Sequence, residues 1–274
     1  MKSSMTISNK GKTSNTFIDD THFVKEDAGY SGFCFQKWCE SNLVLPTKFG
    51  INRAIDYSHG AAKYEIIAEE PWKLDYTKVG LIGKAMGEIH SQAFSAFSDG
   101  ELKFLKTKSF KAPSDLTHYD ISPAELDLRN EVLQLVDIDI NTSTPKLPLH
   151  RDFRLHNILS DGNKLWLIDF DYAAIDIVSH ELVAMMLDIS YHGLHYVETF
   201  IREYLRHSSL NISDIIVDEH MYYLATDTFP YDRKSTLSDK NYNLLCDERT
   251  SRLNRLKVFR KDFKDFIRMS LESK

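Results

Sequence analysis

The chain has 274 residues, of which 42% are hydrophobic and 27% charged, so it can bury a core in one large domain or two lobes. This composition excludes fibrous and disordered proteins. Its 34 basic and 40 acidic residues give a net charge of −6, which disfavours a nucleic-acid partner. We expect a cytoplasmic protein without a membrane partner, because the first 16 residues are polar, no apolar run is long enough to span a bilayer, and the three cysteines show no disulfide or metal spacing.

The first 70 residues are predicted to form a small antiparallel sheet with one inserted helix. Short apolar pairs alternate there with turn-forming polar residues, as is typical of strands. A helix is expected at 31–41, because Phe35 and Cys39 fall on one face and Pro46 follows the helix end. The expected strands lie around 5–7, 17–18 and 23–24 and over 50–57 and 62–68.

From Pro71 onward the chain is predicted to be mainly helical. The apolar residues of 79–93 recur every three or four positions, which indicates a buried helix face. Between residues 147 and 168, short apolar runs flank Asp161 and Gly162, a pair typical of a hairpin turn. We therefore expect two lobes, 1–70 and 71–274. The further expected helices are 122–137, 179–187, 196–206 and 252–271.

Charge is unevenly distributed in the second part of the chain. Seven acidic residues and one basic residue lie between 161 and 198, and this surplus favours a cationic acceptor by its field. Neutral sugars and homoserine-like acceptors stay open, since some of these carboxylates have other tasks. The segment 249–274 carries nine basic and three acidic residues around an apolar stripe. It is expected to be a terminal helix that packs on the domain with a solvated outer face.

The segment HRDFRLHN at 150–157, followed by IDFD at 168–171, carries the strongest chemical signal. Phosphoryl transfer needs a carboxylate that orients or deprotonates the attacking hydroxyl, and oxygen ligands for Mg²⁺. Asp152 suits the first task, and Asn157 and Asp169 suit the second. Singly, each residue has an ordinary explanation in a turn or at a strand end. The combined spacing is what indicates a metal and phosphate site.

These motifs resemble those of the aminoglycoside phosphotransferase and choline kinase families, which are distant relatives of protein kinases. The resemblance extends to GEIH at 87–90 and DFDYAA at 169–174, and it covers about 17–187. It implies an α+β, two-lobed, protein-kinase-like fold with a small antiparallel-sheet N-lobe and a larger, mainly helical C-lobe. It also implies ATP or GTP as the phosphoryl donor, Mg²⁺ as cofactor, a nucleotide-binding lobe at 1–70, and a catalytic and acceptor lobe at 71–274.

The resemblance also implies a role for each matching residue. Asp152 would be the catalytic base, while Asn157 and Asp169 would hold Mg²⁺. Asp171 would assist the metal or the acceptor, and Lys25 would be the lysine that anchors phosphate. The remaining implied residues are Glu69 and Glu70 in the hinge near adenine, and Arg154, whose guanidinium either neutralises the transferred phosphoryl group or pairs with Asp171.

The chain departs from the family pattern in the first lobe. The helix at 31–41 has Gly32 where an acidic partner of Lys25 is expected, and the sequence does not decide between Gln36 and Glu40 as substitutes.

Two groups of loop residues have further expected roles. The polar turn at 10–15 has one glycine, although its backbone amides could still cover phosphate. His150 is expected to hold the catalytic loop by hydrogen bonding, whereas His156 and His180 are expected to pack within loops.

The favoured function is a small-molecule O-kinase that acts on an amino sugar, basic antibiotic, amino alcohol or sugar metabolite. The short gap from Asp169 to the helix near Ser179 supports it, because kinases that phosphorylate peptides carry a longer segment ending in an A-P-E-like anchor. One alternative is an atypical protein kinase. The other is a catalytically weak, kinase-like nucleotide-binding regulatory module, which the missing acidic partner of Lys25 suggests. The oligomeric state stays open.

Overall fold

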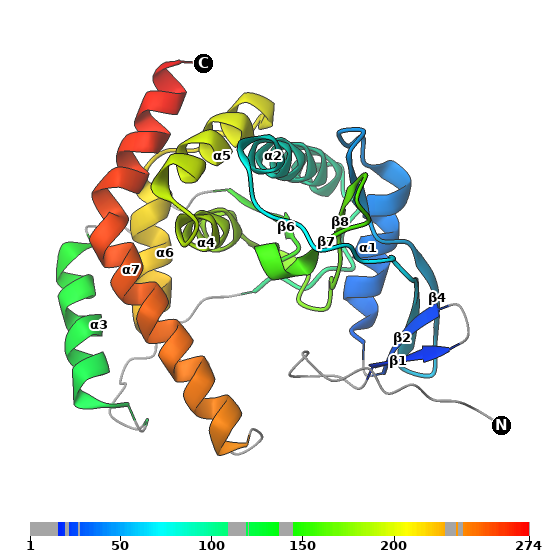
Figure 1. Ribbon diagram of the computed structural model, residues 1–274, viewed down its shortest axis with the longest axis horizontal. Helices are drawn as coiled ribbons and strands as arrows, with labels where there is room; N and C mark the ends of the chain where they lie inside the picture. The colour runs from blue at the N-terminus through cyan, green and yellow to red at the C-terminus, as the bar shows by residue number, and fades with distance from the viewer. Residues whose placement is uncertain are drawn as a thin grey trace.

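A computed structural model describes residues 16–19, 22–26, 28–108, 119, 121–136, 145–227, 234 and 238–273. The strand expected around 5–7, the polar turn at 10–15 and the expected helix end at 137 lie outside these residues. The fold has two lobes, as the sequence predicted: helix α1 and strands β1, β2 and β4 lie on one side, and helices α3, α6 and α7 on the other (Figure 1). Between them lie α2, α4 and the strands of the catalytic region.

The N-lobe is a four-stranded antiparallel sheet covered by one helix. Its strands follow the spatial order β1-β2-β5-β4. Helix α1, at Tyr30–Asn42, contributes Phe33 to a small apolar cluster with Ala62 and Tyr64 from the sheet. The strands are β1 Thr16–Asp19, β2 His22–Glu26, β4 Ala54–Ser58 and β5 Ala61–Glu65.

The strand expected over 50–57 is in fact two strands in two different sheets. Strand β3, at Phe49–Ile51, pairs in parallel with β8, at Leu165–Leu167. The next backbone amide, that of Asn52, donates to the carbonyl of Leu167, and the chain then turns into β4 of the N-lobe. The prediction of one strand was wrong because a run of alternating apolar residues does not show where a chain changes its pairing partner. As a result, the N-lobe is tied directly to the sheet of β7 and β8, whose hairpin lies between Asn157 and Asp169.

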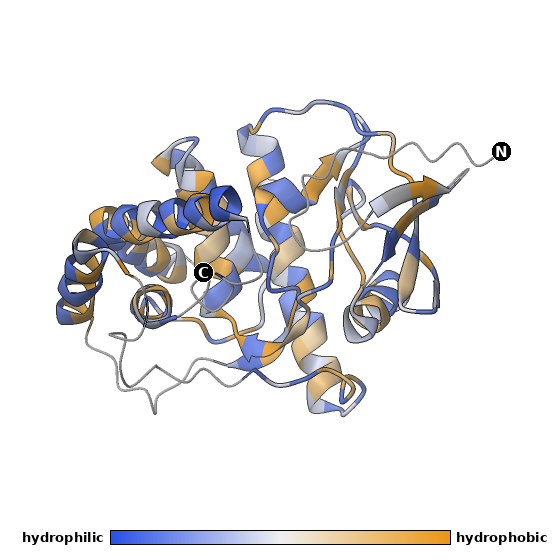
Figure 2. Ribbon diagram, turned by 90° about the horizontal axis from the view of Figure 1, so that it is seen from below, coloured by the Kyte–Doolittle hydropathy of each residue, from blue (hydrophilic) through white to orange (hydrophobic). Residues whose placement is uncertain are grey.

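The C-lobe is mainly helical, with two small sheets at its centre. Orange and blue alternate along several of its helices in Figure 2, whereas every residue of α4 is buried. One helix, α6, was not predicted, and α7 begins 13 residues before the expected 252, because Ser238 caps its N-terminus through the amide of Asn241. The elements are α2 Tyr76–Ser98, α3 Pro123–Leu135, β6 Lys146–Leu149, the 3-10 turn η1 Leu155–Asn157, β7 Ile158–Ser160, β8, β9 Ala174–Ile177, α4 Ser179–Ser190, α5 Leu194–His207, α6 Ile215–Thr226 and α7 Asp239–Glu272.

The core of the C-lobe forms where α2, α5 and α7 pack against the central elements. The apolar face predicted for 79–93 is buried throughout, which confirms that assignment. The apolar stripe of α7 is buried as well, at Leu253, Leu256, Phe263 and Ile267, so α7 packs on the domain as expected. Among the described helices, none combines the length and apolar character needed to cross a bilayer.

Candidate active site

The loop between β6 and β7 is closed by hydrogen bonds among its own residues. The Nδ2 of Asn157 donates to the backbone oxygen and to the Oδ2 of Asp152, at 2.8 Å each. The Nε2 of His150 donates to the carbonyl of Ile168 at 2.8 Å, while the amide of Asp152 donates to His150 Nδ1 at 3.2 Å. The expected role of His150 in holding this loop is confirmed, and both hydrogen bonds are consistent with one tautomer of its ring.

The segment 168–171 returns beside this loop through the hairpin of β7 and β8. The turn is the expected one, with Gly162 at φ +86° and the Asp161 carboxylate accepting from the amides of the next residues. The amide of Ile168 then donates to the backbone oxygen of Asn157 at 3.0 Å. Asp169 follows in a left-handed conformation, at φ +64°, which is unusual for a residue with a side chain.

Lys25, on β2 of the N-lobe, reaches this segment. Its Nζ lies 2.8 Å from Asp169 Oδ1 and 2.6 Å from Asp171 Oδ2, and its side chain is 8% exposed. The structure therefore brings Lys25 of the N-lobe sheet together with the segment after β8, which lies more than a hundred positions later in the chain.

The ionisation of these groups follows from burial and from neighbouring charges. Burial by itself lowers the pKa of Lys25, but the carboxylates of Asp169 and Asp171 outweigh it and raise this pKa. Burial raises the pKa of Asp171, and the charge of Asp169 adds to that effect. Burial would also raise the pKa of Asp152, yet the hydrogen bond and charge of His156 and the charges of nearby side chains hold it below its usual value. Asp152 is therefore a carboxylate at neutral pH.

Neither Gln36 nor Glu40 is the partner of Lys25. Gln36 Nε2 donates to the backbone oxygen of residue 52 at 2.7 Å, and Glu40 accepts from the amide of residue 54 at 3.1 Å. Both expected substitutes are thus committed to the backbone that joins β3 to β4. Asp171 takes the place of the missing acidic residue, although its expected role was to assist the metal or the acceptor.

Gly32 lets α1 approach the backbone of the segment 168–171. A Cβ at this position would lie 2.2 Å from the carbonyl oxygen of Phe170 and 3.2 Å from the Cα of Asp171. A longer side chain at this point of α1 would collide with the segment that presents Asp169 and Asp171. The glycine and the second carboxylate are therefore two parts of one local arrangement.

The donor set beside Lys25 suits a hard divalent cation such as Mg²⁺. Asn157 uses Nδ2 to hold Asp152, so its Oδ1 stays available, and the Oδ2 of Asp169 has no hydrogen bond within the described ranges. Oxygen ligands of this kind are those that Mg²⁺ prefers. No cluster of three or more His, Cys, Asp or Glu suited to a metal occurs among the described residues.

A buried network that the sequence did not predict supports the catalytic loop. Glu181 on α4 accepts a hydrogen bond from the amide of Arg151, and its Oε1 lies 2.9 Å from His90 Nε2. The other ring nitrogen of His90 lies 3.0 Å from the hydroxyl of Tyr204. Arg151 has φ +66° and its side chain pairs with Asp176 at 2.7 Å. His90 belongs to the GEIH motif, but its partner lies 91 positions away, and no pattern in the sequence indicates that pairing.

The residues expected in the hinge lie on the surface beside β7. The amide of Glu70 donates to the carbonyl of Ser160 at 2.7 Å, and Trp72 Nε1 donates to the carbonyl of Ile158. The side chains of Glu69 and Glu70 are both exposed. The segment expected to form the hinge is thus held to β7 by the backbone of Glu70 and the side chain of Trp72.

Arg154 points away from the segment 168–171 and toward the helices of the C-lobe. Its Nε and Nη2 bind the carboxylate of Asp188 at 3.0 and 2.8 Å, and its Nη1 binds Glu248 at 3.1 Å. Of the two expected alternatives, pairing with Asp171 is therefore wrong. Arg154 is the N-cap residue of η1, and its side chain extends toward α4 and α7. The structure does not bring Arg154 together with Lys25.

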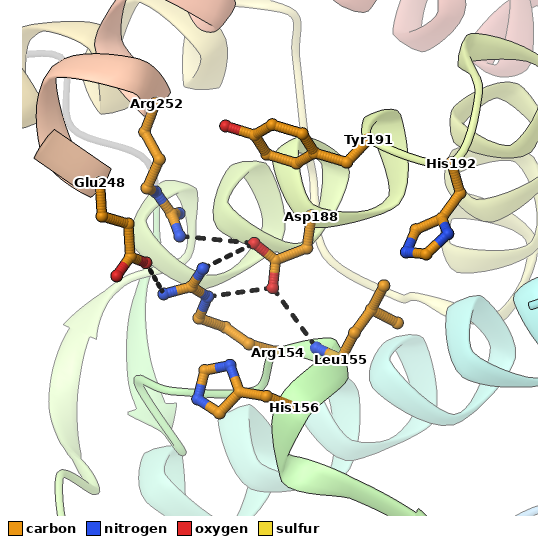
Figure 3. Close-up of a pocket in the computed structure, with 8 residues that line it drawn as sticks. All are labelled: Arg154, Leu155, His156, Asp188, Tyr191, His192, Glu248 and Arg252. Atoms are coloured by element: carbon orange, nitrogen blue, oxygen red, sulfur yellow. Dashed lines mark hydrogen bonds and ion pairs between the residues drawn. The ribbon is translucent and has the colours of Figure 1, made fainter. Parts of the chain in front are cut away.

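A cavity of about 260 Å³ opens beside Arg154 (Figure 3). His156 lines it and is 55% exposed, with Nε2 3.4 Å from Asp152 Oδ2, so the expected packing role of His156 is wrong. His180 is buried as expected, with its ring 3.9 Å from that of Tyr223. The remaining charged residues of the wall, Asp188, Glu248 and Arg252, come from α4 and α7 and were not predicted as site residues.

A model of the phosphotransferase enzyme family matches residues 68–212, more than half of the chain. Among curated proteins, none matches the chain. Solved structures share the fold at low identity. Aminoglycoside 2'-phosphotransferase-IIIa in its GDP complex has a TM-score of 0.61 and 13% identity, with 91% of this chain and 93% of that chain covered. Choline kinase LicA from Streptococcus pneumoniae has a TM-score of 0.56 and 14% identity, with 94% of each chain covered. Amicoumacin kinase hAmiN, with AMP-PNP and Ca²⁺, has a TM-score of 0.55 and 14% identity, with 96% of this chain and 88% of that chain covered.

Proposed function

The chain belongs to the phosphotransferase enzyme family, and from this premise we propose that it transfers the terminal phosphoryl group of ATP to a hydroxyl of a small molecule. The observation that carries the proposal is the ion pair of Lys25 with Asp169 beside the hydrogen-bonded Asp152 and Asn157. Solved relatives hold ADP, AMP-PNP or GDP, which supports a nucleotide donor, with GTP as the alternative.

Each residue of the cluster has a proposed task. Lys25 anchors the phosphates of the donor, and Asn157 and Asp169 supply oxygen ligands to Mg²⁺. When bound, the metal offsets the negative charge of the triphosphate. Asp171 keeps its contact with Lys25 when Asp169 is engaged elsewhere, so the ammonium group stays in place. Asp152 receives the acceptor hydroxyl, because it is ionised and the hydrogen bond from Asn157 Nδ2 fixes the orientation of its carboxylate.

The transfer exchanges one phosphorus–oxygen bond for another. The acceptor oxygen bonds to the terminal phosphorus while the bond from that phosphorus to the bridging oxygen breaks, and ADP leaves with the bonding electrons. The hydroxyl proton passes to the carboxylate of Asp152 and from there to solvent. Because the pKa of Asp152 is lowered, this carboxylate is a weak base. Its main contribution is therefore to orient the hydroxyl, and the proton moves late.

The acceptor is proposed to be small, because little chain is available to hold a peptide. Only nine residues separate Asp169 from α4 at Ser179, and β9 occupies four of them by pairing with β6. We propose 1–70 as the nucleotide-binding lobe and 71–274 as the catalytic and acceptor lobe. Glu69 and Glu70 would meet adenine through their backbone. Arg154 is proposed to shape the acceptor side of the loop.

The substitution Asp152→Asn tests the proposal. It keeps the hydrogen bond partner of Asn157 but removes the acceptor of the hydroxyl proton, so turnover should fall by about two orders of magnitude or more. Nucleotide binding measured by calorimetry should stay near the wild-type value. Asp99→Asn, at the exposed end of α2, is the matched control and should leave both quantities unchanged. Turnover of the Asp152 variant within a factor of three of wild type would remove this residue from the mechanism.

A further inference from the structure

The cavity beside Arg154 lies next to the proposed base and has the position of an acceptor pocket. Its wall includes His156, whose ring nitrogen lies 3.4 Å from the carboxylate of Asp152, and the neighbouring Leu155 of the same turn. A ligand in this cavity therefore contacts the loop that presents the base. Its volume of about 260 Å³ gives room for a small metabolite.

Both carboxylates of the cavity wall pair with Arg154. Both oxygens of Asp188 accept from Arg154, and Oδ2 also accepts from the amide of Leu155 at 3.4 Å. Glu248 accepts from the third nitrogen of the same guanidinium. Figure 3 shows these groups turned toward one another across the cavity wall, with Asp188 at the centre. Asp188 is thus engaged through both oxygens, whereas Glu248 is bound through Oε1 and its side chain is 38% exposed.

Arg252 is the cation of the wall that has few partners. A guanidinium has five N–H donors, yet within the described part of the chain Arg252 makes one hydrogen bond, from Nη1 to Asp188 Oδ1 at 3.4 Å. That oxygen already accepts from Arg154 at the shorter distance of 2.8 Å. Burial, and next the charge of Arg154, lower the pKa of Arg252, as expected of a cation with incomplete pairing. An anion in the cavity would accept hydrogen bonds from the remaining N–H groups of Arg252.

Several members of the acidic surplus of 161–198 have partners away from this cavity. Asp176 pairs with Arg151, and Glu181 with the backbone of the catalytic loop. Asp161 accepts from its own hairpin turn and from Trp166. The structure thus gives these three carboxylates roles outside the cavity wall. The wall carries two guanidinium groups against two carboxylates, together with the rings of His156 and His192.

We propose that this cavity binds a small alcohol carrying an anionic group, a carboxylate or a phosphate, and that Arg252 is the residue that binds this group. The proposal rests on the proposed function, because the alcohol is the phosphoryl acceptor. Two guanidinium groups on one wall suit an anion with two oxygens, since planar N–H pairs match carboxylate and phosphate geometry. Aminated acceptors would place an ammonium group against Arg252, a group of like charge.

Two series of size-matched alcohols test the proposal. The three-carbon series is glycerate, glycerol 3-phosphate, glycerol and 3-amino-1,2-propanediol, and the six-carbon series is gluconate, glucose 6-phosphate, glucose and glucosamine. Binding is measured by calorimetry with AMP-PNP and Mg²⁺ present, and transfer is measured separately as acceptor-dependent ADP release. We expect an anionic member to bind at least tenfold more tightly than its aminated counterpart. The carboxylate and phosphate arms show which anion fits.

Arg252→Gln removes the charge and should weaken binding of the preferred anion by at least tenfold, with nucleotide affinity unchanged. Arg252→Lys keeps the charge and should recover part of the loss. Lys261→Gln, an equal charge change at an exposed position of the same helix, should have no effect. Thermal melting confirms that each variant is folded.

The possible failures are distinguishable. Tighter binding of the aminated members, the absence of anion binding at millimolar concentration, or equal anion binding by wild type and Arg252→Gln would each overturn the inference about the cavity. Transfer to an aminated or neutral alcohol would overturn only that inference and would support the proposed function. Binding of an anion that depends on Arg252, with no transfer to any alcohol, would support the cavity and count against the proposed function.

Discussion

Replacing Gly32 with alanine should disturb the active site through one methyl group. The new Cβ would lie 2.2 Å from the carbonyl oxygen of Phe170, whereas ordinary contacts begin at 3.4 Å, so the two atoms must separate by about 1.2 Å (3.4 − 2.2). The obstacle is backbone, which cannot rotate away as a side chain does. Helix α1 or the segment 168–171 must move instead.

The size of the effect follows from this displacement. Overpacking of this kind costs about 1–3 kcal/mol, and alanine returns about 1 kcal/mol of helix propensity, so the free energy of unfolding should fall by about 1 kcal/mol. Activity should fall further. A shift of about 1 Å at a reacting geometry can cost about 10²-fold, and here it acts on the residue between Asp169 and Asp171. We expect kcat/KM for the nucleotide to drop by about two orders of magnitude.

Urea unfolding and steady-state kinetics measure the two effects, with Gly80→Ala as the matched control. Gly80 is also inside a helix, but the heavy atom nearest to its added Cβ is the Cγ of Glu203 at an ordinary 3.5 Å. That variant should be more stable by up to about 1 kcal/mol, with unchanged kinetics. If Gly32→Ala behaved in the same way, the close packing of α1 on Phe170 would be refuted.

Three further predictions concern groups around the site and in the core. Asp171→Asn should raise the KM for the nucleotide about tenfold while Asp152-dependent turnover persists, because Lys25 loses one of its two carboxylates; an unchanged KM would show that this pair is dispensable. Glu181→Ala leaves a buried loop amide without a partner and should cost about 3 kcal/mol in urea unfolding, whereas a cost below about 1 kcal/mol would contradict the described network. His220 is buried, neither ring nitrogen has a partner among the described residues, and burial holds its pKa well below 6.5. Below pH 6.5 the unfolded chain binds a proton that the folded chain does not, so stability should fall by about 1.4 kcal/mol from this group at pH 5.5. His220→Phe should flatten that slope, and an identical slope in the variant would assign it to other groups.

The sequence by itself determined the features that depend on short spacings. Asp152 and Asn157 are five positions apart, and a closed loop of that length brings their side chains into contact. The hairpin at Asp161 fixes the return of Asp169 in the same way. The apolar period of 79–93 predicted the buried face of α2. Over such distances the local backbone geometry leaves few alternatives, so motif and structure agree.

Only the tertiary structure decided which charges meet. The partner of Lys25 is 144 positions away and that of Arg252 is 64 positions away, so packing of whole elements selects them. The acidic surplus of 161–198 favoured a cationic acceptor, because a sequence shows the charges without showing which of them are paired. Folding places cations from the catalytic loop and α7 against these carboxylates, and the field at the cavity reflects the pairs and not the count. The pairing of β3 with β8 could not be predicted for the same reason, because it depends on where the two lobes meet and not on alternation within one strand.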